Sequence, residues 1–315
     1  CCIYCYVVYY HSSSCILCFK VLQLNCINRL MKAIIFSLLG WIFLPVMDGF
    51  AKYLSADLPI LQITWARYFF TVVFTLPIMF FFFNKQLVWS DKPKLQILRG
   101  LILLTANICF FYAISVISLA KALTLAFIAP LIVTAFSPLL LGEKVGLRRW
   151  TAVIIGFTGS LIVIRPGFVE INLASLSALG TGFLYGFYLI ITRKLSNSDN
   201  PLLTLLITGA VGAILVSLVI PFYWVKPSFN QWSLMAGIGI FACVGHIFLI
   251  LSLKYADASK LAPLGYTEII PNVLIGYYFF NELPDNWTYL GLFIIILSGL
   301  YISWRQYLLD RNKIV

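Results

Sequence analysis

The stretch "LLLGEKVGLRRW" at residues 139–150 has a counterpart in "YFFNELPDNWTY" at residues 278–289. In each, an apolar run ends in Gly-Glu or Asn-Glu, a short polar turn follows, and a second apolar run begins. A nearly constant separation of 139 or 140 residues relates three pairs of like residues: Glu143 and Glu282, Lys121 and Lys260, and Gly159 and Gly299. Self-similarity at one offset indicates an internal duplication.

The composition of the chain indicates its solvent. Hydrophobic residues make up 62% of the chain and charged residues 10%, with a mean hydropathy of +0.97. A soluble domain is about 45–50% apolar and about 25% charged, so the composition predicts an integral membrane protein. The net charge of +11 comes from basic residues between long apolar runs. This pattern indicates membrane topology rather than nucleic-acid binding.

Apolar runs of membrane-spanning length follow one another after Met31. A spanning helix needs about 20 mostly apolar residues. About ten such runs lie near 33–54, 60–83, 97–118, 120–141, 148–165, 172–191, 203–224, 232–253, 258–280 and 286–305. The links between them are short and rich in turn residues, so we predict an all-α integral membrane protein without a soluble domain.

The distribution of Lys and Arg predicts the orientation of the chain. With Met31 in the cytoplasm, fifteen basic residues fall in cytoplasmic segments and four in external ones. The cytoplasmic group includes Lys92, Lys94 and Arg99, which we assign to the link after the second run. The positive-inside rule then predicts that both termini are cytoplasmic.

The duplication divides the runs into two units, residues 31–167 and 168–307, with a cytoplasmic tail at 308–315. Each unit holds about five spans, and an odd number inverts the second unit relative to the first. Inverted repeats are the plan of many secondary transporters. A channel or a merely structural helical bundle is the alternative interpretation.

Residues 1–30 differ from the rest of the chain. They hold six of the eight cysteines, and Met31 followed by Lys32 and an apolar run is typical of a natural start. We interpret residues 1–30 as a non-native upstream extension. The alternative is a metal or disulfide segment built on Cys15 and Cys18, although a single C-x-x-C is weak evidence for one.

The runs "LGEKVGLRRWTAVIIGFTGSLIVIRPG" at 141–167 and "APLGYTEIIPNVLIGYYFFNELPDNWTYLGLFIIILSGLYI" at 262–302 resemble the EamA-type family of the drug/metabolite transporter superfamily. Shorter stretches are similar to S-adenosylmethionine uptake carriers of rickettsiae and other alphaproteobacteria: "DGFAKYL" at 48–54, "ARYFF" at 66–70, "LRG" at 98–100 and "YTEII" at 266–270. The resemblance covers roughly residues 33–307. It implies an inner-membrane carrier that works by alternating access around a central cavity lined by both repeats. The same superfamily moves riboflavin, amino acids and other metabolites, by import or export.

Charged side chains inside the apolar runs are the candidates for substrate binding. A charge at the bilayer centre costs about 2.5–3.5 kcal/mol, so it is a functional hypothesis by default. Glu268 lies near the middle of the ninth run, whereas its counterpart in the first repeat falls near Ala129 and Pro130. We expect Glu268 to bind substrate or a proton, with a helix–helix hydrogen bond as the alternative.

Four further polar residues inside the runs are candidates for the same site. Asp48 either binds substrate or pairs with Lys52, four residues later on the same helical face. Arg67 either binds substrate, clamps two helices or snorkels to the membrane surface. His246 and Asn107 are candidates whose alternative role is hydrogen bonding within the packed bundle.

Aromatic residues could stack on a flat ring of the substrate, or could serve as packing and interface anchors. The candidates are Tyr112, Tyr188 and Tyr266, together with Trp65 and Tyr185.

Four other residues have predicted structural roles. Pro130 and Pro271 are expected to break their helices near the midplane, freeing backbone groups beside a cavity. Glu143 and Glu282 are expected to bond the backbone N–H groups that open the next helix, with direct substrate contact or gating as the alternative.

The buried charges suggest a mechanism. Glu268 and Asp48 would attract a cationic substrate, and a base such as Arg67 or Lys52 would bind its carboxylate. Coupling to a proton through Glu268 and exchange for a counter-substrate stay open, as does a homodimer. No H-E-x-x-H pair or serine nucleophile elbow is present, so no enzyme, metal or cofactor is predicted.

Overall fold

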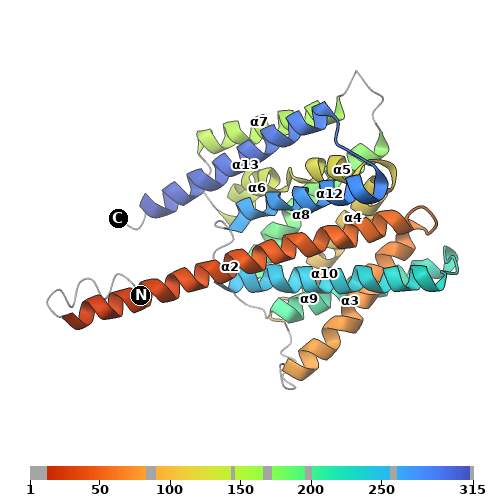
Figure 1. Cartoon of the computed structure of the whole chain (residues 1–315), viewed down its shortest axis with the longest axis horizontal. Coiled ribbons are helices and arrows are strands. Elements are labelled where there is room, and N and C mark those ends of the chain that lie inside the picture. The colour runs from red at the N-terminus through yellow and green to blue at the C-terminus, as the bar shows by residue number, and fades with distance from the viewer. Residues whose placement is uncertain are drawn as a thin grey trace.

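The computed structural model describes residues 13–82, 90–142, 146–165, 172–195, 201–255 and 261–312, and every element in these ranges is a helix (Figure 1). The α-helices are α2 (Ser13–Leu54), α3 (Ile60–Phe82), α4 (Pro93–Val116), α5 (Leu119–Ala126), α6 (Ala129–Leu141), α7 (Leu147–Ile164), α8 (Leu173–Leu195), α9 (Pro201–Val219), α10 (Phe229–Tyr255), α12 (Ile269–Phe280) and α13 (Asn286–Asn312). Two 3₁₀ segments, η1 (Ile220–Phe222) and η2 (Ala262–Glu268), complete the set. The all-α prediction is confirmed.

Within the described ranges, nine segments are long and apolar enough to cross a membrane. The predicted ninth run, near 258–280, is not among them, and its described part is divided into two pieces. In its described part, η2 contributes seven residues and α12 contributes twelve. At about 2.0 and 1.5 Å per residue these two pieces reach roughly 32 Å, which matches a hydrocarbon core of about 30 Å. The ninth crossing is therefore an interrupted helix rather than a continuous one.

The fourth crossing is interrupted as well. Helix α5 ends at Ala126 and α6 begins at Ala129, with Pro130 in its first turn, where a missing N–H is tolerated. Pro271 occupies the corresponding place near the start of α12, after η2. Both breaks therefore lie beside the prolines from which they were predicted.

The duplicated stretch at residues 139–150 and 278–289 ends a helix in the same way in both repeats. Gly142 follows α6 with φ 70°, and Asn281 follows α12 with φ 53°. Both are left-handed C-caps, a conformation in which glycine and asparagine are favoured. The backbone N–H of Glu282 then donates a 2.9 Å hydrogen bond to the carbonyl of Gly276. The Gly-Glu and Asn-Glu pairs therefore mark equivalent helix ends.

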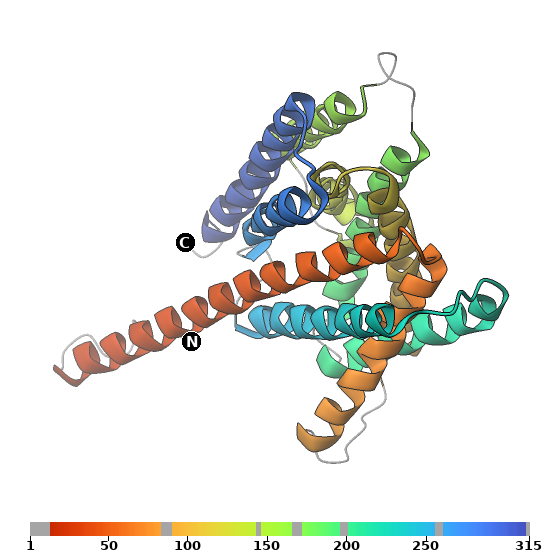
Figure 2. The same ribbon diagram turned by 45° about the vertical axis from the view of Figure 1, so that its right-hand side comes forward.

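Two helix pairs connect distant parts of the chain. Helix α2 lies beside α10, and α7 lies beside α13, in both views (Figures 1 and 2). Where α7 packs on α13, Gly159 faces Gly291, and a Cβ on Gly291 would meet the Gly159 carbonyl oxygen at 2.6 Å. Because α7 and α13 each close one repeat, this pair joins the two repeats.

Contacts between helix ends agree with the predicted alternation of crossings. Gln62, near the start of α3, exchanges hydrogen bonds of 2.8 and 3.0 Å with the backbone of Val225, before α10. Arg165, after α7, pairs at 2.6 Å with Asp285, before α13. All four residues lie in or next to links assigned to the external side, and both contacts join one such link to another.

Candidate functional site

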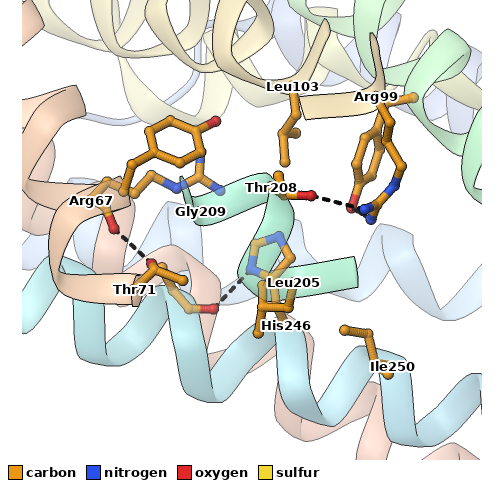
Figure 3. Close-up of a pocket in the computed structure, with 12 residues that line it drawn as sticks. Arg67, Thr71, Arg99, Leu103, Leu205, Thr208, Gly209, His246 and Ile250 are labelled. Carbon is orange, nitrogen blue, oxygen red and sulfur yellow. Dashed lines mark hydrogen bonds between the residues drawn. The ribbon is translucent and has the colours of Figure 1, made fainter. Parts of the chain in front are cut away.

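A cluster of polar side chains lies inside the bundle where helices of both repeats meet. A cavity of about 20 Å³ marks this place, and its walls come from α3, α4, α8, α9 and α10 (Figure 3). The polar residues that line it are Arg67, Tyr68, Thr71, Arg99, Tyr188, Thr208 and His246. A cavity needs about 10–15 Å³ to hold one water molecule. The cavity therefore has room for about one water molecule.

Arg67 reaches this cavity from α3. It is only 5% exposed, so the alternative that it snorkels to the membrane surface is wrong. Its guanidinium carbon lies 5.3 Å from the ring centre of Tyr68 and 6.0 Å from that of Phe111. Its Nη1 atom is buried and has no hydrogen-bond partner in the described part of the chain. Arg67 therefore brings an unsatisfied donor to the site.

Arg99 also lines the cavity, and the sequence did not predict it as a candidate. The charge count placed it in a cytoplasmic link, but it lies in the second turn of α4 and is 3% exposed. Its Nε donates to the Thr192 hydroxyl at 2.7 Å, Nη1 to the Thr208 hydroxyl at 2.9 Å, and Nη2 to the Tyr188 hydroxyl at 2.6 Å. These bonds tie α4 to α8 and α9. The signal available in the sequence was that Arg99 falls inside the third apolar run.

His246 faces the cavity from α10. Its Nδ1 lies 2.8 Å from the Ala242 carbonyl oxygen, one turn earlier. Because a carbonyl only accepts, Nδ1 is the donor in this bond. The ring is thereby oriented, and its other nitrogen points toward Thr208 and the cavity (Figure 3).

Asn107 acts behind the cavity wall rather than in it. It lies on α4 and donates a short hydrogen bond to the hydroxyl of Tyr68, which itself lines the cavity. The structure therefore gives Asn107 a role in orienting Tyr68.

The two carboxylates, Asp48 on α2 and Glu268 at the end of η2, are buried close to the cavity but do not line it. They are 3% and 8% exposed. The Asp48 carboxyl interacts electrostatically with Arg67 and with Glu268. Its Oδ1 atom has no hydrogen-bond partner in the described residues. The acids and the arginine therefore belong to one buried polar centre.

The alternative that Asp48 pairs with Lys52 is wrong. The Lys52 Nζ atom lies 2.8 Å from the Glu282 carboxylate and donates a 2.9 Å hydrogen bond to the Ile117 carbonyl. Glu282 therefore links the end of α12 to α2, and does not bond the start of α13 as expected. That position belongs to Asp285, whose Oδ1 accepts from the Thr288 backbone N–H at 3.0 Å. Glu143, its predicted counterpart, lies outside the described residues.

Asp285 caps the start of α13, and its surroundings lower the pKa of its carboxyl. Partial burial raises the pKa of its carboxyl. Hydrogen bonds from the Thr288 side chain and backbone, with the nearby charges of Arg165 and Lys121, outweigh burial and hold the pKa below its usual value of 3.8. The carboxylate is therefore ionised at neutral pH, where it complements the helix N-terminus.

The predicted aromatic residues separate into two groups. Tyr188 lines the cavity and stacks on Tyr185 with ring centres 5.2 Å apart. Tyr266 packs edge-on against Phe127 in the apolar core, at 5.2 Å. Tyr112 does not line the cavity.

Trp65 belongs to an aromatic cluster near the external links, with ring centres 5.4 Å from Trp224 and 6.5 Å from Trp232. Among the described residues, no group of three or more His, Cys, Asp or Glu side chains could hold a metal ion.

Long apolar helices around an interior polar cavity are typical of a multi-pass membrane protein. The model of the EamA-like transporter family matches residues 31–165 and again residues 172–304. The chain belongs to the EamA-like transporter family, and it is a metabolite transporter rather than an enzyme. The match to two successive segments agrees with the internal duplication found in the sequence.

Several characterised proteins are similar to this chain over most of its length. The S-adenosylmethionine uptake transporter of Rickettsia prowazekii (strain Madrid E) is 25% identical, over 90% of this chain and 96% of that protein. The riboflavin transporter of Vibrio cholerae serotype O1 is 27% identical, over 82% and 88%. The pseudopaline exporter CntI of Pseudomonas aeruginosa is 26% identical, over 88% and 98%. A crystal structure of a protein with 16% identity shares the fold, with a TM-score of 0.62 over 85% of this chain and 95% of that one.

Proposed function

We propose that this protein takes up a small charged metabolite by alternating access, and that S-adenosylmethionine is its leading substrate. The observation that carries the proposal is the buried centre in which Asp48 and Glu268 lie within electrostatic range of each other, with Arg67 beside Asp48. Buried charges of both signs suit a substrate with charges of both signs, because neither can be left unpaired in a low dielectric without a large penalty.

The chemistry of S-adenosylmethionine fits these groups. Its sulfonium and ammonium would be attracted to the two carboxylates, and its carboxylate to an arginine. The stacked rings of Tyr185 and Tyr188 offer a face for adenine. The rickettsial relative named for this substrate supports the same choice.

A second candidate is riboflavin, supported by the name of the relative from Vibrio cholerae. The same tyrosine pair could stack on its ring system. Riboflavin is uncharged, however, and would leave Asp48 and Glu268 without a ligand charge. Amino acids and other metabolites, imported or exported, follow as further candidates.

The site would open and close within a bacterial inner membrane. We place both termini in the cytoplasm on the charge distribution of the links, and the exposed apolar side chains of the helices in contact with lipid. A fluorescent protein fused after Val315 should then fluoresce, and alkaline phosphatase at the same place should be inactive. The opposite pair of results would indicate that the C-terminus lies outside the cytoplasm.

Transport would be driven either by a proton carried on Glu268 or by exchange for an internal metabolite. Reconstituted vesicles distinguish the two. A pH gradient alone drives uptake in the first case, and preloaded substrate is needed in the second. A homodimer is a further expectation, tested by the mass of the purified protein in detergent.

Uptake of labelled S-adenosylmethionine by bacterial cells expressing the full chain tests the proposed function. We expect saturable uptake above that of vector cells. Asp48→Asn and Glu268→Gln should abolish it at equal membrane abundance. Asp57→Asn is the matched control, because Asp57 is exposed and its carboxyl accepts a hydrogen bond from Gln231 across the external links, away from the cavity.

Each outcome of this assay has a separate meaning. Uptake that persists in Asp48→Asn and Glu268→Gln would support S-adenosylmethionine as the substrate and reject the proposed role of the two acids. Absence of uptake by the abundant wild-type protein would reject S-adenosylmethionine, and riboflavin and amino acids would be assayed next.

A further inference from the structure

We propose that the cavity beside Arg67 and Arg99 is a carboxylate-binding subsite, so that the transported metabolite must carry a carboxylate group. This inference rests on the proposed function and deepens it by naming the chemical class that this part of the site selects. The buried acids, Asp48 and Glu268, would bind the cationic part of the same substrate.

The first argument is the charge of the cavity. Two arginines line it, Arg67 and Arg99, and none of its lining residues is acidic. They are 5% and 3% exposed, so solvent does not screen them. Neither lies within ion-pair distance of a carboxylate among the described residues. Asp48 attracts Arg67 from outside the cavity, but no carboxylate of the described ranges contacts either guanidinium directly, and buried cations of this kind typically mark a ligand pathway in a membrane protein.

The second argument is that Arg99 is held but not neutralised. The side-chain groups that accept its hydrogen bonds are the uncharged hydroxyls of Thr192, Thr208 and Tyr188. The Tyr188 ring also lies 4.5 Å from the guanidinium carbon. These contacts come from α8 and α9 and fix the position of the guanidinium. Arg99 therefore supplies a fixed positive field to the cavity.

The third argument is the free donor on Arg67. Its Nη1 atom is buried without a hydrogen-bond partner in the described part of the chain. Leaving such a donor unsatisfied is costly, and hydrogen bonds to charged groups are among the strongest in proteins. A carboxylate that entered the cavity would accept from this atom while it is attracted by Arg99. The two arginines would then share roles, with Arg67 binding directly and Arg99 acting through its field.

The size of the cavity indicates at which stage of the transport cycle a carboxylate would bind. At about 20 Å³ it accepts a group of the size of a water molecule, whereas ligand pockets are about 300–1,000 Å³. Its walls are contributed by α3 and α4 of the first repeat and by α8, α9 and α10 of the second. A carboxylate would therefore enter as the two repeats separate during the transport cycle.

A matched pair of ligands tests the subsite without any mutation. Unlabelled S-adenosylmethionine and decarboxylated S-adenosylmethionine compete against uptake of labelled S-adenosylmethionine in cells expressing the full chain. We expect the decarboxylated compound to compete about 10- to 100-fold more weakly, as for loss of one charge-assisted hydrogen bond. Equal competition by the two compounds would overturn the subsite and leave the proposed function standing.

Variants then assign the effect to the arginine. Arg67→Gln should reduce the discrimination between the two ligands to within about threefold, and Arg67→Lys should retain part of it. Arg148→Gln is the control, because Arg148 is exposed at the start of α7, away from the cavity. Should Arg67→Gln fail to reach the membrane, Arg67→Lys carries the comparison. Full discrimination in a folded Arg67 variant would overturn the assignment.

A second readout separates failure of the subsite from failure of the proposed function. If the wild-type protein takes up no S-adenosylmethionine, the purified full chain is heated in detergent with methionine or with methioninamide, which lacks the carboxylate. A rise in the melting midpoint with methionine only, lost in Arg67→Gln, would keep the subsite and reject the substrate. No shift with either compound would reject both.

Discussion

Substituting one glycine of α8 by alanine should destabilise the protein, whereas the same change two residues earlier should not. Gly182 packs where the fourth crossing is interrupted. A Cβ built on it would lie 2.6 Å from the Ala126 carbonyl oxygen and 2.6 Å from Cγ1 of Ile128. Gly180, on the same helix, has nothing within 4 Å of its Cβ position. The pair therefore compares a close backbone contact with open space.

The size of the effect follows from these distances. Real Cβ atoms are essentially never found closer than 3.0 Å to a heavy atom of another part of the chain. The break at Ala126 would thus have to move by roughly 0.4 Å or more in Gly182→Ala, and overpacking of this kind costs about 1–3 kcal/mol. Alanine is favoured over glycine in a helix by about 1 kcal/mol, so Gly180→Ala should be neutral or stabilising by up to that amount.

Thermal unfolding of the purified full chain in detergent, followed by circular dichroism, measures both variants. Chains of 150–250 residues shift their midpoint by about 2–4 °C per kcal/mol. We expect Gly182→Ala to melt several degrees below Gly180→Ala. Equal midpoints for the two variants would refute the close packing of α8 on the interrupted crossing.

Two further predictions concern the external links. In a double-mutant cycle, Lys52→Gln and Glu282→Gln should show a coupling of about 1 kcal/mol, because the pair is partly screened from solvent; a coupling of zero by thermal unfolding would contradict the 2.8 Å contact. The pKa of Asp285 is lowered on folding, so the stability it contributes is fully present above its ordinary value of 3.8 and is lost as pH falls below it. The Asp285→Asn protein should therefore lose less stability than wild type between pH 5 and about pH 3; parallel pH profiles of the melting midpoint would contradict this.

Much of the fold could be predicted because hydropathy and helix ends are local properties. The apolar runs predicted the nine long crossings, and the prolines predicted where the fourth and ninth crossings break. The extent of the second break was not predicted. A 3₁₀ segment such as η2 has the same apolar composition as the α-helix that was expected there.

The residues that line the cavity were predicted in part, and the reasons differ from residue to residue. Arg67 and His246 were found because a charge or an imidazole inside an apolar run is conspicuous. Arg99 was missed because it lies close enough to the start of its helix to resemble a residue of a cytoplasmic link. The hydroxyl groups that accept its hydrogen bonds come from α8 and α9, which are distant in the sequence.

The sequence by itself determined the membrane class, the duplication and the helix ends, since each depends on composition or on residues close together in the chain. The tertiary structure alone decided the partners of the charges. Lys52 could have paired with Asp48 one turn away, but it pairs with Glu282, from the other repeat. Asp48 is thereby left beside Arg67 in the interior. Charge pairing acts through space, so the packing of the two repeats, rather than position in the chain, decides which charges meet.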